Sequence, residues 1–266
     1  MALPELNYFA SGEWVDPPSP SHPLKVVAAD SFVVDQGKTI GYDQHLSRFA
    51  AAITDAGFSL DAELTEFISR CEMWIPREGR WFPRFDLVAS REGHFFRYHH
   101  RLAPAQQETA SLIVAPSDTR LVPHRKGPDL ERMGDLRWWA YSRGAQEALI
   151  LSPEGILVEG AYSAIAVIDP DTDELALTPR GLPRIPSVTE EIVRTLADDE
   201  GLNVVEKPHT LAQLEGKEVW VLSALHGIRA GTSILEGPSL AENDERRLRM
   251  HQRLQQEARL LPYPPA

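Results

Sequence analysis

The amino-acid sequence predicts an α+β fold divided into two domains, and two observations lead to this prediction. Runs rich in β-branched and aromatic residues alternate with helix-period segments in both halves of the chain. Between the halves, residues 103–125 are punctuated by proline and glutamine and hold one apolar strand candidate, Ser111–Val114. A chain of 266 residues is long enough for one large domain or two of ordinary size. We therefore predict an N-terminal domain at 1–115, a linker at 116–125 and a C-terminal domain at 126–266.

The first hundred residues are expected to form strands, then two helices, then strands again. Apolar spacing indicates a helix to about Ala56, with Asp43 as its N-cap. A second helix is expected to be capped by Ser59 or Asp61. The expected strands and hairpins are Asn7–Trp14, Lys25–Ile40 with a turn at 35–38, Trp81–Ala89 and His94–Leu102.

The second domain is expected to open with a helix and a hairpin. Helical periodicity runs from Leu130 to Arg143 and is stopped by Gly144. Two apolar runs follow, joined by a Ser-Pro-Glu-Gly turn, and the second run ends on Glu159-Gly160. The remaining expected elements are strands at 165–168, 175–177, 203–206 and 219–222, helices at 188–197, near Leu211 and at 241–260, and a loop at 223–231.

Composition narrows the classes of function. The formal net charge is −12, from 27 basic and 39 acidic residues, and an acidic surface repels phosphate backbones, which argues against nucleic acid. The single cysteine, Cys71, cannot form an intrachain disulfide and fits a reducing compartment. No apolar run reaches the ~18 residues of a membrane span, and the N-terminus lacks the pattern of a signal peptide. The expected location is the cytoplasm, and no metal site is expected.

Lys126 is the first candidate catalytic residue. It follows an apolar segment and a proline at a strand-to-helix transition, where desolvation can remove the proton from its ammonium group. A neutral lysine forms a Schiff base with a carbonyl compound. The ordinary alternative is a solvated surface charge, which describes most of the basic residues in this chain.

Glu159 is the second candidate, because it ends a strand one hairpin after the helix that follows Lys126. A carboxylate beside a pyridine nitrogen keeps that nitrogen protonated, which makes pyridoxal phosphate an electron sink. The ordinary alternative is a carboxylate that caps a turn at the end of a strand. Taken by itself, Glu159 fits this alternative better.

Two further features could bind an anion. Ser187-Val188-Thr189 opens a helix, whose free N–H groups and dipole attract phosphate. Ser187 with Glu190 also fits a plain capping box, which does not exclude a phosphate. His45 and Arg48 lie three residues apart on one helical face, and Arg48 could bind a phosphate bidentately or form a surface salt bridge.

In this order, these features resemble the class IV, or fold type IV, pyridoxal-phosphate enzymes. That family includes branched-chain and D-amino-acid aminotransferases and 4-amino-4-deoxychorismate lyase. The resemblance covers about residues 25–235 and depends on the order and spacing of the motifs. The matching motifs are His45-Leu46-Ser47-Arg48, Lys126, Glu159-Gly160, Ser187-Val188-Thr189 and Ser223-Ala224-Leu225.

The resemblance implies a role for each of these positions. Lys126 would hold pyridoxal 5'-phosphate as an internal aldimine and then act as acid and base, and Glu159 would face the pyridine nitrogen. The phosphate would be held by Arg48, Ser187, Val188, Thr189, Ser223 and Ala224. The family fold is two α+β domains with the cofactor in the cleft between them. The family assembly is a homodimer whose partner subunit reaches into the site.

The chain departs from the family pattern at several positions. The Asp-Arg-Gly and Gly-Asp-Gly motifs near the N-terminus are replaced by a proline-rich stretch and the segment 27–32. Ala164 stands where many members have asparagine, and Ser187 replaces a glycine. Candidates for substrate contact are Arg84, Arg97, Tyr162 and His226, with packing favoured for the tyrosine; the further arginines Arg101 and Arg229 could also bind a carboxylate.

The sequence therefore indicates a class IV aminotransferase acting on an amino acid or another primary amine. The loop Ser223-Ala224-Leu225 is closer to that of 4-amino-4-deoxychorismate lyase, which makes this lyase the first alternative. The departures at Ala164 and Ser187 motivate a second alternative, a non-catalytic binding homodimer. The presence of both Lys126 and Glu159 argues against the second alternative, because a structural fold needs neither.

Overall fold

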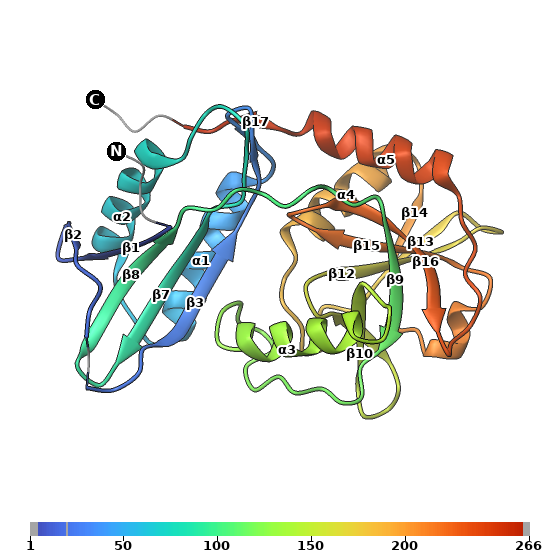
Figure 1. The fold of residues 1–266 in the computed structure, drawn as a ribbon. Coiled ribbons are helices and arrows are strands. Elements are labelled where there is room, and N and C mark those ends of the chain that lie inside the picture. The colour runs from blue at the N-terminus through green and yellow to red at the C-terminus, as the bar shows by residue number, and fades with distance from the viewer. Residues whose placement is uncertain (1–4, 20, 263–266) are drawn as a thin grey trace. The chain divides into compact units, whose positions relative to one another are not determined.

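The computed structural model describes residues 5–19 and 21–262, and the chain divides into two compact units. Unit 1 consists of Met1–Ala105, Arg125–Pro128 and Ala258–Ala266, and unit 2 of Gln106–His124 and Asp129–Glu257. The mixture of helices and sheets confirms the predicted α+β class, and Figure 1 shows the elements of each unit.

Unit 1 is built on a five-stranded antiparallel sheet in the order β2-β1-β8-β7-β3. Helices α1 and α2 pack on one face of this sheet, where Phe49, Phe67, Phe85 and Phe96 form the centre of an aromatic core. The elements are β1 (Leu6–Ala10), β2 (Glu13–Val15), β3 (Lys25–Ser31), β4 (Val34–Asp35), β5 (Lys38–Thr39), α1 (Tyr42–Asp55), α2 (Asp61–Trp74), β6 (Arg80–Trp81), β7 (Arg84–Ser90), β8 (Gly93–His99) and β17 (Arg259–Leu260).

Both helices of unit 1 were predicted, but their expected caps are wrong. The N-cap of α1 is Gly41, which adopts the left-handed conformation with φ of 67°, so Asp43 lies inside the first turn. There its carboxylate faces the positive end of the helix dipole without capping an N–H group. The N-cap of α2 is Leu60, and no side chain caps that helix.

The end of the described chain returns to unit 1. Strand β17 pairs with β5 in a small four-stranded sheet, and Leu261 is only 2% exposed in the core of unit 1. Arg77 donates hydrogen bonds to the carbonyl groups of Leu261 and Pro262. The last residues of unit 1 therefore follow the whole of unit 2 in sequence.

Lys126 lies in a short segment that packs against the edge strand β3. The N–H group of Ala29 donates to the carbonyl group of Lys126 at 2.8 Å. Gly127 follows with φ of +136°, and a Cβ atom on it would lie 2.7 Å from Cα of Ala28. Only glycine allows this close approach without a shift of the backbone.

Unit 2 is built on an eight-stranded mixed sheet in the order β11-β10-β9-β16-β15-β12-β13-β14. Strands β11 and β12 also contact each other, so the sheet curls. The elements are β9 (Thr109–Val114), α3 (Leu130–Tyr141), β10 (Glu147–Leu151), β11 (Leu157–Gly160), β12 (Ala164–Asp169), β13 (Glu174–Leu177), α4 (Val188–Asp199), β14 (Asn203–Glu206), η1 (Leu211–Leu214), β15 (Glu218–Ser223), β16 (Gly227–Leu235) and α5 (Asp244–Gln256).

Strand directions gather several loops of unit 2 at one end of the sheet. Strands β11, β13 and β15 end there, and β12 and β16 begin there, because neighbouring strands in the segment β16-β15-β12-β13 are antiparallel. The predicted hairpin that ends on Glu159 is confirmed, with Glu159 opposite Ile150. The predicted loop at 223–231 is wrong, because β16 already begins at Gly227 and leaves only a tight turn.

The observed boundaries of the two units differ from the expected domain boundaries, and strand β9 explains the difference. It forms parallel pairs with both β10 and β16, so it is a central strand of unit 2. Unit 2 therefore begins at Gln106 rather than after the linker expected at 116–125. Among the helices of the described residues, none has the length and apolar character needed to cross a membrane.

The packing of Gly127 leads to a stability prediction. Gly127→Ala should lower the free energy of unfolding by about 2–4 kcal/mol, because the new Cβ adds overpacking to left-handed backbone strain. Gly155→Ala is the matched control, since Gly155 also has a positive φ but has no atom within 4 Å of an added Cβ. Denaturant unfolding of both variants measures the difference. Equal losses in the two variants would show that β3 does not hold the Lys126 segment closely.

Candidate functional site

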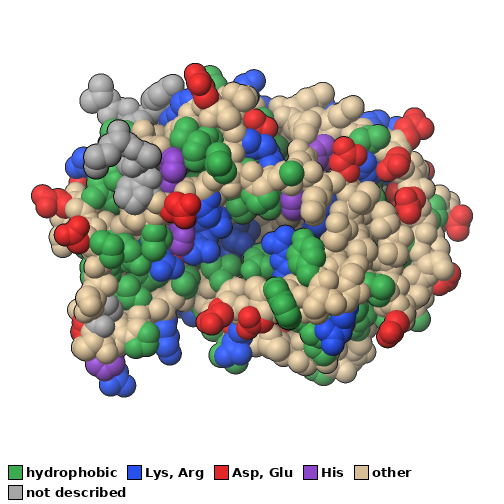
Figure 2. Space-filling model, viewed as in Figure 1, with side chains coloured by type: hydrophobic (Ala, Val, Ile, Leu, Met, Phe, Trp, Pro, Cys, Tyr) green, Lys and Arg blue, Asp and Glu red, His purple; other side chains and the backbone are tan. Residues whose placement is uncertain are grey.

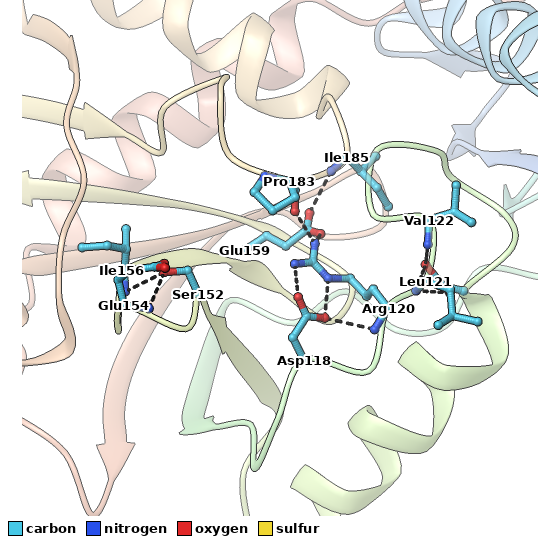
Figure 3. Close-up of polar contacts among 11 residues, drawn as sticks. Asp118, Arg120, Leu121, Val122, Ser152, Glu154, Ile156, Glu159, Pro183 and Ile185 are labelled. Atoms are coloured by element: carbon cyan, nitrogen blue, oxygen red, sulfur yellow. Dashed lines mark hydrogen bonds and ion pairs between the residues drawn. The ribbon is translucent and has the colours of Figure 1, made fainter.

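Glu159 ends β11 and is buried, with its side chain 7% exposed. Nη1 of Arg120 donates to Oε1 of Glu159, and the N–H group of Ile185 donates to Oε2 at 3.3 Å. Arg120 also donates to the Pro183 carbonyl group at 2.8 Å and, through Nε and Nη2, to both carboxylate oxygens of Asp118. Figure 3 shows the guanidinium group lying between the two carboxylates.

The electrostatic setting of Glu159 follows from this geometry. Burial raises the pKa of Glu159 to about 7, and the charges of Arg120 and Arg184 and the Ile185 hydrogen bond oppose this rise. Arg120 compensates only in part, because it shares its single positive charge with Asp118. The pKa of Glu159 therefore lies above its usual range even though the carboxylate is paired with Arg120.

The turn that follows Glu159 is held by a second buried carboxylate, Glu147. Oγ of Ser163 donates to Glu147 at 2.9 Å, and the N–H group of Tyr162 donates to it at 3.3 Å. Arg229 donates to the same carboxylate at 3.3 Å. The Tyr162 ring, 39% exposed, lies against α3 beneath the guanidinium group of Arg137, which fits the packing role favoured from the sequence.

The start of α4 has the predicted N-cap, since Oγ of Ser187 accepts from the N–H group of Glu190 at 3.2 Å. The reciprocal half of the predicted capping box is wrong, because the Glu190 side chain pairs with the buried Arg184. Helix geometry leaves the N–H groups of Val188 and Thr189 without intrahelical acceptors. Within residues 5–19 and 21–262, no side chain or carbonyl group accepts from them.

The turn between β15 and β16 supplies the last candidates of unit 2. Oγ of Ser223 accepts from the N–H group of His226, which closes the turn around Ala224. The buried His226 ring accepts a hydrogen bond at Nδ1 from the N–H group of Gln107 at 3.2 Å. Nδ1 of His226 is therefore occupied by a backbone hydrogen bond from the residues that precede β9.

Arg48 and Lys126 belong to unit 1, on and beside its helix-covered face. Nε and Nη2 of Arg48 donate to both carboxylate oxygens of the buried Asp30, at 2.7 and 2.8 Å. Nδ1 of His45 lies 2.8 Å from the same carboxylate. Burial would raise the pKa of Asp30, but the charge of Arg48 and its hydrogen bonds, with those of His45, hold that pKa well below its usual range.

The charge of Lys126 also affects the pKa of His45. Burial lowers the pKa of His45, Asp30 opposes this change, and the charges of Arg48 and Lys126 lower the pKa further. The positive charge of Lys126 therefore acts on the His45 ring, which binds Asp30 in the same unit. At neutral pH the Arg48 charge balances Asp30, and the histidine is neutral.

The opposite face of the unit 1 sheet carries a basic cluster around the buried Asp86. Arg84, Arg97 and His99 all bind this carboxylate, at 2.9, 2.7 and 2.6 Å. Burial would raise the pKa of Asp86, but the His99 hydrogen bond and the two arginines lower it to about 2. Arg101 adds a charge on this face by donating to Ser31. Figure 2 shows Lys, Arg and His side chains gathered over the strands of unit 1.

The structure thus distributes the predicted site residues over both units. Unit 1 holds Arg48, Arg84, Arg97 and Lys126, and unit 2 holds the others. In unit 2, Glu159 and the segment leading into α4 are joined through Ile185. Among the described residues, no group of three or more His, Cys, Asp or Glu side chains is arranged to hold a metal ion.

Sequence reasoning missed the charged partners of the predicted residues. Asp118 and Arg120 lie in a loop shortly before Lys126, and Asp30 and Asp86 lie in strands. Two aspartates inside otherwise apolar strands were the available signal, because a buried carboxylate requires a partner. No local pattern distinguishes Arg120 from the other arginines of the chain.

Several solved structures have a fold similar to that of this chain. A hypothetical aminotransferase from Mycobacterium tuberculosis, in its PLP-bound form, is 15% identical, with 95% of this chain and 98% of that chain covered and a TM-score of 0.76. The branched-chain aminotransferase of Thermoproteus uzoniensis with norvaline is 16% identical, with coverage of 94% and 93% and a TM-score of 0.79. The Escherichia coli branched-chain aminotransferase is 14% identical, with coverage of 94% and 92% and a TM-score of 0.78.

These structures share the fold of this chain and confirm the predicted fold type. No match was found among curated protein sequences. The family model for amino-transferase class IV matches residues 28–234, which is most of the chain and includes Lys126 and Glu159. This protein belongs to the class IV aminotransferases.

Proposed function

We propose that this chain is a pyridoxal-phosphate-dependent aminotransferase that acts on an amino acid or a related primary amine. The observation that carries the proposal is the buried Glu159 carboxylate, which ends β11 and has one donor on each oxygen. A carboxylate can accept about four hydrogen bonds, so it has room for the N–H group of a pyridine ring. When bound, the cofactor supplies an electron sink for the substrate carbanion.

The start of α4 fits the phosphate group of this cofactor. Val188 and Thr189 are buried and present N–H groups that lack an intrahelical acceptor. The positive end of the helix dipole favours an anion at this position, and the Arg184–Glu190 pair leaves the charge of Glu190 balanced. Arg48, Ser223 and Ala224 stay predicted phosphate residues, and Asp30 already occupies two donors of Arg48.

Lys126 supplies the reactive amine. The backbone of its segment is fixed by the Ala29 hydrogen bond and by the close packing of Gly127, so the amine starts from a defined position. In the proposed reaction, Lys126 would hold the cofactor and would then act as the acid and base of the 1,3-proton transfer: it would take the proton from the α-carbon of the amino donor in one half-reaction and give one to the α-carbon of the keto acid in the other.

The basic cluster around Asp86 is proposed to bind the substrate carboxylate. Arg84 and Arg97 carry two positive charges against the single charge of Asp86, so the cluster keeps a net positive charge with neutral His99. The Thermoproteus uzoniensis aminotransferase of similar fold was solved with norvaline, an amino acid whose carboxylate is an anion of the kind that arginines bind. Arginine suits such a group because its planar fork binds a carboxylate bidentately.

A homodimer is proposed as the functional assembly. On α3, Trp138 is 74% exposed and Tyr141 is 44% exposed, and the guanidinium group of Arg137 lies over the rings of Tyr141 and Tyr162. Exposed aromatic residues with an arginine are typical of the centre of a protein interface. A second copy of this chain is the proposed occupant.

The cofactor assignment is tested by trapping. Purified protein incubated with pyridoxal phosphate and reduced with borohydride should carry the cofactor on the peptide containing Lys126, as measured by mass spectrometry. Lys126→Ala should prevent trapping and lower turnover by at least about 100-fold. The control is Lys38→Ala, which removes an exposed lysine of β5. Trapping that persists in Lys126→Ala, or a protein that never binds the cofactor, would refute the assignment.

The reaction class is tested by two assays on the same preparation. Amino transfer from a panel of amino acids to a keto acid is expected. Pyruvate release from 4-amino-4-deoxychorismate is the outcome that would instead identify the lyase. Cofactor binding with neither activity would point to the non-catalytic homodimer.

The carboxylate assignment predicts a change in KM. Arg97→Gln should raise KM for a keto acid about 10- to 100-fold, since a hydrogen bond to a charged group contributes about 1.5–3 kcal/mol. Steady-state kinetics with an amine donor that lacks a carboxylate provide the internal comparison, because its KM should not change. Arg70→Gln, at an exposed helical pair, is the control variant. An unchanged keto-acid KM in Arg97→Gln would remove this cluster from substrate binding.

The assembly is tested with Trp138→Glu. This variant should raise the dimer dissociation constant about tenfold or more, because it places a charge in an aromatic interface. Sedimentation velocity across a concentration series measures the change. Leu248→Glu is the control, since Leu248 is exposed on a different helix, α5. A dimer that tolerates Trp138→Glu would exclude this surface from the interface.

A further inference from the structure

Arg120 is a buried arginine, and nearly all of its donors are assigned. Its side chain is 2% exposed. Nε and Nη2 bind Asp118 at 2.9 and 2.7 Å, and Nη1 binds both the Pro183 carbonyl group at 2.8 Å and the Glu159 carboxylate. Four of the five N–H groups of the guanidinium are therefore used. The orientation of the guanidinium is fixed without any contribution from Glu159.

The loop that presents Arg120 is held at both of its sides by carboxylates. Oδ1 of Asp118 accepts from the N–H group of Arg120 at 3.0 Å, which forms a local turn. The carboxylate of Asp129 accepts from the N–H groups of Leu121 and Val122, at 2.8–3.0 Å. Figure 3 shows these contacts on the segment that carries Arg120. The backbone on either side of Arg120 is thus constrained before its side chain reaches Glu159.

We propose that Arg120 is the positioning residue of Glu159, that it fixes the orientation and the ionised fraction of this carboxylate, and that Asp118 limits how much of the guanidinium charge reaches it. Asp118 binds through two N–H groups and Glu159 through one, so the division of charge is built into the geometry. That Glu159 in turn acts on the pyridine nitrogen of pyridoxal phosphate rests on the proposed function. The effect of Arg120 on Glu159 itself does not.

The two partners should act in opposite directions on Glu159. Loss of Arg120 removes the charge that favours ionisation, while burial continues to favour the neutral form. Loss of the Asp118 charge leaves the Arg120 charge to Glu159 alone. Ile185 and Arg184 remain in both cases and keep their own effect. A residue that only supported the loop would change stability without this opposite pair of effects.

The experiment titrates Glu159 in the protein without cofactor. The protein is labelled with glutamate that is carbon-13 enriched at the carboxyl carbon, and Glu159→Gln identifies the resonance of Glu159. Arg120→Gln should move the titration midpoint upward by about 1–3 pH units, because a neighbouring opposite charge is lost. Asp118→Asn should move it downward by about one pH unit. Arg180→Gln, at an exposed arginine that pairs with Glu191, should leave the midpoint unchanged.

The outcomes separate the inference from the proposed function. A folded Arg120→Gln protein with the wild-type midpoint overturns the inference. If that variant does not fold, an unchanged or raised midpoint in Asp118→Asn overturns it instead. Midpoints that move as expected support the inference, even if the wild-type protein fails to bind pyridoxal phosphate, which would contradict only the proposed function. Cofactor binding with unmoved midpoints would leave the proposed function intact and contradict only the role of Arg120.

Discussion

The need to compensate a buried carboxylate organises the candidate site. Moving a carboxylate out of water costs several kcal/mol unless charges and hydrogen bonds replace the lost hydration. Asp30, Asp86 and Glu159 each meet this need with a different set of basic residues. For Asp30 and Asp86 the compensation is complete enough to lower the pKa, whereas for Glu159 it is incomplete and the pKa rises. Of these three carboxylates, Glu159 is the one proposed to bind the cofactor ring, and burial raises the pKa of Glu190 and Glu218 as well.

Much of the fold could be predicted because its signals are local. The hairpin that ends on Glu159 is marked by turn residues between two apolar runs, and the Ser187 cap is marked by its own helix. Other features depend on partners far away in sequence. The prediction placed β9 at the end of the N-terminal domain, whereas its pairing with β10 and β16 makes it a central strand of unit 2. Gly41 caps α1 through a left-handed backbone, which a search for polar caps does not detect.

The candidate site was predictable to a smaller extent, for a related reason. Lys126 and Glu159 were predicted from the order of the elements between them, which resembles that of the class IV family, and their roles stay predictions. Arg120 could not, since the distance in sequence between Arg120 and Glu159 leaves no pattern, and arginines are common in this chain. A nearby partner was missed as well, because the Glu190 side chain binds Arg184, six residues earlier, instead of completing the helix cap. The tertiary structure determines which charged side chains pair with one another. The partners of the predicted residues therefore could not be identified from the sequence.

The return of the chain to unit 1 after α5 has a consequence for biosynthesis. A ribosome releases the residues of unit 2 before it releases β17 and Leu261, which pack in unit 1. Until Leu261 is added, the core of unit 1 lacks one buried side chain and β5 is paired only with β4. During that interval, the open edge of β5 and the incomplete core of unit 1 are surfaces through which the nascent chain can associate with other chains.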